Sequence, residues 1–196
     1  MKNQKELYLY IQEIQILKCY LHLGTYHHAL YIQQLGKVTL TQRITERSKY
    51  IFPVTAEAAN EVASNLRPDD YREVAEGHGL DPLIAVPLST QIGDSVYFKV
   101  PNGRTAGLAG VQAGGLVWML TTDAIEDYPI TFAREAKRFI DSRDEPLLWN
   151  IVDKRNRTHL KLLKFLGFKF LREIEHGPNK LSFIEFCRVR KDRTRS

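Results

Sequence analysis

Residues 147–186 read LLWNIVDKRNRTHLKLLKFLGFKFLREIEHGPNKLSFIEF and carry the strongest structural signal in this chain of 196 residues. The first six residues are rich in β-branched and aromatic types, which is typical of a strand. Asn156 follows a polar break, and its side-chain oxygen can accept a hydrogen bond from a free N–H at the start of a helix. Gly167 can end that helix in the left-handed conformation. The pattern therefore predicts a strand, a short helix and a second strand.

The predicted helix has one apolar face. Leu160, Leu163 and the pair at 165–166 lie at helical spacing, so we expect them to face the core. The elements that follow are a strand at 168–174, a turn at 176–179 and a final strand at 181–189.

The residues before this stretch predict alternating helices and strands. Thr55 can cap a helix, and Asp70 with Glu73 has the spacing of a capping box. The Asn-Gly pair at 102–103 is a strong hairpin signal, whereas two prolines interrupt the apolar segment at 80–90, which we predict as a short helix or turn. The other predicted elements are a strand at 51–54, helices at 55–64 and 66–77, strands at 95–100, 105–112 and 116–121, and a helix at 128–140.

Four residues, Val152, Asn156, Gly167 and Phe168, resemble the last core segment of GNAT-type N-acyltransferases, where a strand ends in a splayed gap and a short helix leads to a Gly-Phe pair. A closer resemblance covers residues 118–186, which are similar to the GNAT-like internal virion protein A family of T-odd, short-tailed phages. The predicted order of elements is also the GNAT order. The resemblance implies an α+β protein with a mixed sheet, in the GNAT-like acyl-CoA N-acyltransferase fold.

The resemblance does not cover the first fifty residues. Leucine and isoleucine recur there at steps of three and four between residues 7 and 21, which predicts a helical hairpin packed on its own body or on another subunit. A membrane-surface helix and poor order remain alternatives. We therefore expect an N-terminal helical extension and linker at 1–50, a GNAT-like domain at 51–189 and a basic tail at 190–196.

The resemblance also implies where acetyl-coenzyme A would bind. In GNAT enzymes the backbone at the end of one strand binds the pantetheine arm, and Leu120, Thr121 and Thr122 stand at that position. An asparagine before the last helix contacts coenzyme A in many relatives, and Asn156 matches it, although a plain helix cap explains this residue equally well.

Two departures from the family pattern argue against acetyl transfer. The glycine-rich loop that should hold the pyrophosphate is replaced by residues 123–129, which contain no glycine and three carboxylates. Asp127 in this loop is predicted to cap its own helix. The tyrosine that should protonate the leaving thiolate is replaced by Leu163, which has no proton to give. We therefore predict no catalytic residue, and the acidic loop makes acetyl-coenzyme A a doubtful cofactor.

Other chemistry finds little support in the sequence. Glu73, Glu76 and His78 could act as a base by their location, but we interpret them as surface polar residues. His22 and its neighbours at 27–28 lack partners at ligand spacing, so no metal site is predicted. The two cysteines, at positions 19 and 187, suggest a reducing compartment, and no apolar run is long enough to span a membrane.

Three hypotheses for function follow. The first is a phage-encoded GNAT-fold protein of the virion or its assembly, with weak or no acetyltransferase activity, located in the virion or the host cytoplasm and bound to other virion proteins. The second is an active acetyl-coenzyme A-dependent N-acyltransferase. The third is a DNA-contacting accessory protein, because the net charge is +5 and basic residues recur in the tail and at positions 154, 155, 157, 161 and 164.

Overall fold

The computed structural model describes residue 44 and residues 48–190, which belong to a compact unit comprising residues 41–196. The predictions for the N-terminal helices, the histidines at 22, 27 and 28, Cys19 and the end of the basic tail lie outside the described residues. Within the described part, no helix is long and apolar enough to cross a membrane.

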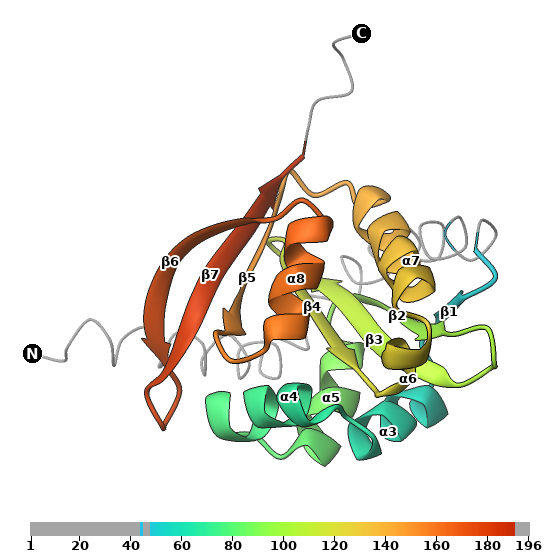
Figure 1. Ribbon diagram of the computed structural model, residues 1–196, viewed down its shortest axis with the longest axis horizontal. Helices are drawn as coiled ribbons and strands as arrows, with labels where there is room; N and C mark the ends of the chain where they lie inside the picture. Colours follow the sequence, from blue (N-terminus) through green and yellow to red (C-terminus); the bar gives the residue numbers. More distant parts are fainter. Residues whose placement is uncertain (1–43, 45–47, 191–196) are drawn as a thin grey trace, which may run out of the picture. The chain divides into compact units, whose positions relative to one another are not determined.

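A single sheet of seven strands organises the described residues (Figure 1). Its strands, in spatial order, are β1 (Ile51–Pro53), β2 (Asp94–Lys99), β3 (Thr105–Gln112), β4 (Leu116–Thr121), β5 (Leu147–Asp153), β7 (Leu181–Val189) and β6 (Lys169–His176). Neighbouring strands are antiparallel except β4 and β5, which are parallel. The predicted meander and terminal hairpin are confirmed, with β3, β4 and β7 at the predicted bounds.

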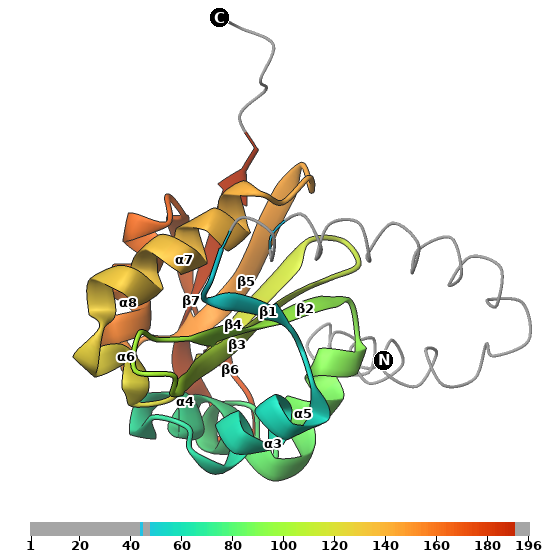
Figure 2. The ribbon, with the colours of Figure 1, turned by 90° about the vertical axis from the view of Figure 1, so that its right-hand side faces the viewer.

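Helices cover both faces of this sheet (Figures 1 and 2). On one face lie α7 (Pro129–Asp141) and α8 (Arg157–Phe165), and on the other lie α3 (Ala56–Ser64), α4 (Pro68–Arg72) and α5 (Pro82–Gln91). A π-helical segment, Glu73–Gly77, continues α4, and the short α6 (Ala124–Asp127) follows β4.

The two-residue alternation of the central strands divides the core into two layers. Phe98 of β2 and Ala109 of β3 pack in the larger cluster with Phe139 of α7, whereas Leu108 of β3 packs with Val62 of α3. This alternation explains why β3 is buried along nearly its whole length, as expected for a strand covered by helices on both faces.

Three local predictions are confirmed. The side chain of Thr55 accepts from the N–H of Ala58 at 3.2 Å, and that of Asn156 accepts from the N–H of His159 at 3.2 Å. Each is an N-cap that satisfies a helix-terminal donor. Gly167 ends α8 with a φ of 86°, a left-handed conformation that favours glycine.

Two predicted caps are wrong. Asp70 and Glu73 do not form a capping box, because α4 begins with Pro68 after Arg67, and no side chain caps it. Asp127 does not cap α7, whose N-cap is Tyr128.

The structure corrects one further expectation and decides between two alternatives for another. Phe165, which was expected to face the core, is 52% exposed, because α8 turns the other members of its apolar stripe toward the sheet. The segment at 80–90 is a helix in spite of its prolines: Pro82 lies in the first turn, and Pro87 is accommodated inside α5.

Candidate functional site

The parallel strands β4 and β5 separate after a single residue pair, Leu116 with Trp149. The cause is the side chain of Asn150, which enters the space between the strands. Its Nδ2 donates to the carbonyl of Val117 at 2.8 Å, and its Oδ1 accepts from the N–H of Ile151 at 2.8 Å. The amide side chain thus bonds to main-chain groups that would otherwise pair β4 with β5. The splayed gap that the resemblance implies therefore exists.

The main chain of β4 presents two residues to this gap. The N–H of Thr122 donates to the carbonyl of Ala106 at 3.0 Å, so Thr122 and, by alternation, Leu120 direct their main-chain groups toward β3. Thr121 and Met119 direct theirs toward the gap. Of the three residues predicted to bind pantetheine, Thr121 is thus the one whose backbone faces the gap.

Side chains and backbone from the start of α4 already occupy the polar groups of Thr121. Its carbonyl accepts from the N–H of Arg67 at 2.9 Å. Asp70 Oδ2 accepts from the N–H of Thr121 at 3.2 Å and from its hydroxyl at 2.5 Å. The gap-facing edge at the end of β4 is therefore satisfied within the chain.

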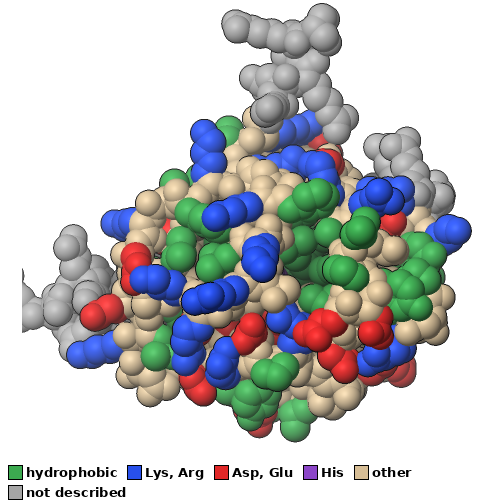
Figure 3. Space-filling model, in the orientation of Figure 1, with side chains coloured by type: hydrophobic (Ala, Val, Ile, Leu, Met, Phe, Trp, Pro, Cys, Tyr) green, Lys and Arg blue, Asp and Glu red, His purple; other side chains and the backbone are tan. Residues whose placement is uncertain are grey.

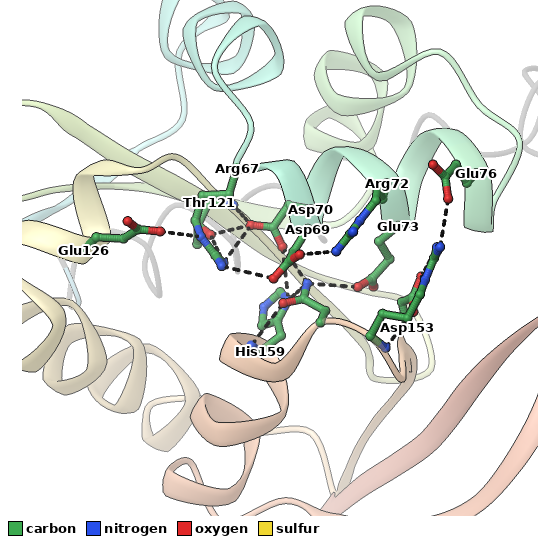
Figure 4. A network of polar contacts seen from close by, with 12 residues as sticks. Arg67, Asp69, Asp70, Arg72, Glu73, Glu76, Thr121, Glu126, Asp153 and His159 are labelled. Atoms are coloured by element: carbon green, nitrogen blue, oxygen red, sulfur yellow. Dashed lines mark hydrogen bonds and ion pairs between the residues drawn. The ribbon is translucent and has the colours of Figure 1, made fainter.

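Asp70 is fully buried and lies at the centre of a polar network (Figure 4). Its Oδ1 accepts from Asn156 Nδ2 at 2.9 Å and faces His159 Nδ1 at 3.4 Å, while Arg67 Nη1 lies 3.4 Å from Oδ2. Two buried cations thus compensate a carboxylate that would be costly to bury alone.

The hydrogen bonds of Asn156 indicate that Nδ1 of His159 carries a proton. Asn156 Nδ2 donates to Asp70 and to Glu73 Oε2, the latter at 3.2 Å, which uses both of its N–H groups. The contact of 3.3 Å between Asn156 Nδ2 and His159 Nδ1 therefore joins two donors. His159 Nδ1 is left to donate to Asp70, and Asn156 has no N–H left for a cofactor.

The pKa values follow from this arrangement. Burial would raise the pKa of Asp70, but hydrogen bonds from His159 and Thr121 and the charge of Arg67 lower it below its ordinary value. Burial would lower the pKa of His159, but its hydrogen bond to Asp70 and the charge of that carboxylate raise it. Both directions favour an ion pair between Asp70 and His159.

Glu73 is also buried, but its pKa shifts in the opposite direction to that of Asp70. Burial and the negative charge of Asp70 raise its pKa to about 7, although the charge of His159 and a hydrogen bond from Asn156 act in the opposite direction. Glu73 therefore keeps its proton to a higher pH than an ordinary glutamate. The interpretation of this residue as surface polar was wrong, whereas Glu76 is exposed as expected.

The loop at 123–129 lies beyond the end of β4 and includes α6. Its acidic groups have partners: Arg104 pairs with Asp123 at 2.5 Å and with Asp127 at 3.1 Å, and Arg67 Nε lies 3.5 Å from Glu126. Asp127 thus forms an ion pair in place of the predicted cap. These pairs reduce the local negative charge, but four residues of helix and no glycine do not form a phosphate cradle.

The position expected for a proton donor is apolar. Leu163 is 6% exposed and packs in the larger core cluster, so this part of α8 supplies no acid. The residues at the gap therefore fit a coenzyme A thioester poorly, because their polar groups already bond to one another and the usual acid is replaced by leucine. Among the described residues, no group of three potential metal-binding side chains is found.

The basic surface expected to contact DNA is partly neutralised. Lys154 pairs with Glu173 at 2.8 Å, and Arg155 pairs with Asp153 at 2.7 Å and with Glu76 at 2.9 Å. Figure 3 shows Lys and Arg side chains over α8 and the loop before it, with acidic side chains among them.

Sequence reasoning missed His159 and Arg67 and misplaced Asp70. A signal was present: Asp70 with Glu73, and Asn156 with His159, are both polar pairs three residues apart, which places each pair on one helix face. The structure brings the two faces together. Trp118 and Leu120 of β4 pack toward α3, whereas Val117 and Met119 pack in the larger core cluster.

Comparison with known proteins identifies the fold. No protein-family model and no curated protein matches the sequence. The structure is similar to that of yncA from Salmonella typhimurium, described with its cofactor acetyl-coenzyme A, with a TM-score of 0.56 and 13% identity over 76% of this chain and 98% of that chain. It is also similar to a GNAT-superfamily phosphinothricin acetyltransferase from Sinorhizobium meliloti, in complex with acetyl-coenzyme A (TM-score 0.54, 12% identity, 72% and 89% covered).

A third similar structure is a GNAT-family acetyltransferase from Bacillus anthracis, with a TM-score of 0.54 and 11% identity over 71% of this chain and 93% of that chain. Identities this low establish the common fold alone. Together with the mixed sheet, the parting of β4 and β5 and the order of elements, they show that this chain has the GNAT-like acyl-CoA N-acyltransferase fold.

Proposed function

We propose that this GNAT-fold protein does not catalyse efficient acetyl transfer and that it acts in a phage virion or in its assembly. One observation supports the absence of efficient acetyl transfer: Asp70 and Arg67 already use the main-chain N–H and carbonyl of Thr121. A pantetheine arm that paired with the end of β4 would have to displace a buried carboxylate from hydrogen bonds with its partners. The buried Leu163 at the position of the usual acid adds support.

The virion role rests on the resemblance of residues 118–186 to the internal virion protein A family. It implies a location in the virion or the host cytoplasm and contacts with other virion proteins. DNA is a further proposed partner, through Arg157, Lys161 and the basic tail. Binding to DNA should weaken steeply with salt, because contacts to phosphates release counterions.

A second candidate function is an acetyl-coenzyme A-dependent N-acyltransferase. It is favoured by Glu73, whose pKa of about 7 suits a group that accepts a proton near neutral pH. Acetyl-coenzyme A is the cofactor to test, because similar structures were solved with it.

Thermal unfolding with and without millimolar acetyl-coenzyme A separates the two functions. A ligand present at one hundred times its dissociation constant stabilises the folded state by about 2.7 kcal/mol. For a domain of this size that stabilisation would raise the melting temperature by roughly 5–10 °C. We expect no such increase.

An increase, together with turnover on an amine that is lost in Glu73→Gln, would replace the first proposal by the second. Turnover that Glu73→Gln leaves intact would contradict both the non-catalytic proposal and the role given to Glu73.

A further inference from the structure

A second feature of the molecule lies beside the buried network. Neither acetyl transfer nor the virion role uses it, and it shares Arg157 with the proposed contact to DNA. It is an open pocket of about 550 Å³, within the size range of small-molecule sites. Its lining comes from α4, from the loop between β5 and α8, from the first residue of α8 and from the start of β7. The lining residues are Arg72, Lys154, Arg155, Arg157, Leu181 and Ser182.

The lining contains four cationic side chains and no acidic one. Ion pairs with residues outside the lining hold three of the cations: Arg72 with Asp69, Lys154 with Glu173, and Arg155 with Asp153 and Glu76. Such pairs lower the net charge but also fix the side chains in place. The N–H of Lys154 donates to the carbonyl of Ser182 at 3.0 Å, which joins the loop to β7.

Two of the cations retain capacity to bind an anion. Within the described residues, the side chain of Arg157 forms no ion pair or hydrogen bond. Arg155 uses three of its five N–H groups on Asp153 and Glu76, which leaves two.

The local backbone adds to this positive character. Arg157 is the first residue of α8, a helix of nine residues, so the pocket lies beside the positive end of the helix dipole. Planar guanidinium groups bind phosphate oxygens in pairs, whereas a monocarboxylate offers fewer acceptors.

We propose that this pocket binds the phosphate group of a small phosphorylated molecule. The pocket is larger than a phosphate ion, so the rest of the ligand lies along Leu181 and Ser182. The proposal concerns binding alone and does not depend on acyl transfer, so a protein that lacks acetyltransferase activity would still bind the ligand.

Inorganic phosphate is the probe, titrated into the full-length protein at constant ionic strength and followed by calorimetry. The test variant is Arg157→Gln and the matched control is Lys161→Gln, which removes an exposed cation from the same helix outside the pocket. We expect saturable binding of phosphate, weakened about tenfold by Arg157→Gln and unchanged by Lys161→Gln, since hydrogen bonds to charged groups are strong. Equal melting temperatures without phosphate would verify that both variants fold.

Four results would overturn the proposal. The first is no saturable binding of phosphate, and the second is equal weakening by the two substitutions, which would indicate a general charge effect. The third is binding of acetate as tight as that of phosphate. Fourth, a single-stranded oligonucleotide without a terminal phosphate that binds with the same dependence on Arg157 would assign the pocket to nucleic acid instead.

Discussion

Replacing Glu73 by glutamine should stabilise the folded protein above about pH 7 and have little effect below about pH 5. Glutamine keeps the shape of the side chain and an oxygen that can accept from Asn156, but it cannot ionise. The substitution therefore removes the cost of a buried negative charge beside Asp70.

The sign follows from the protonation of the two states. In the unfolded chain Glu73 loses its proton near its ordinary pKa of 4.5, whereas in the folded protein the pKa is about 7. Between these values the folded state binds more protons, so the free energy of unfolding falls as pH rises and levels off above about pH 7. At 1.36 kcal/mol per pKa unit, the full loss is about 3 kcal/mol.

Urea unfolding followed by the fluorescence of Trp118 and Trp149 measures this effect across about pH 5 to 8. The wild-type protein should lose stability over this range, and Glu73→Gln should lose about 3 kcal/mol less. The raised pKa of His159 also makes stability fall at high pH, but both proteins retain its pair with Asp70. The difference between the two curves therefore reports on Glu73.

Glu76→Gln is the matched control, because Glu76 is exposed on the same helical segment and its ion pair with Arg155 lies at the surface. It should change stability by less than about 1 kcal/mol. Parallel curves for wild type and Glu73→Gln would refute the reasoning, since they would mean that Glu73 carries no excess proton in the folded state.

Further substitutions test the network and the core. Asp70→Asn should cost about 3–5 kcal/mol, because it leaves buried cations without their partner, whereas Asp69→Asn at a partly exposed carboxylate should cost about 1 kcal/mol. Urea unfolding measures both, and equal effects would mean that the network does not stabilise the fold. Phe168→Ala should cost about 3–5 kcal/mol as a buried aromatic, against less than about 0.5 kcal/mol for the 61% exposed Leu171→Ala. A near-neutral Phe168→Ala would show that this part of the core is wrongly assigned.

The splayed gap shows which features local sequence patterns predicted and which they did not. The pattern of residues 147–186 predicted β5, α8 and the terminal hairpin, and the resemblance placed a gap beside them. What holds the gap open is the side chain of Asn150, which bonds to Val117 across it. Only the packing of two distant segments defined which groups Asn150 uses.

The sequence by itself determined the elements, because periodicity, caps and turn residues act within a few positions of one another. It also determined that Leu163 supplies no acid, since a residue type fixes its own chemistry. Only the tertiary structure decided that Asp70 and Glu73 are buried against Asn156 and His159, more than eighty residues away. The pKa of a carboxyl group depends on its burial and its neighbours, and these are set when helices pack across the sheet.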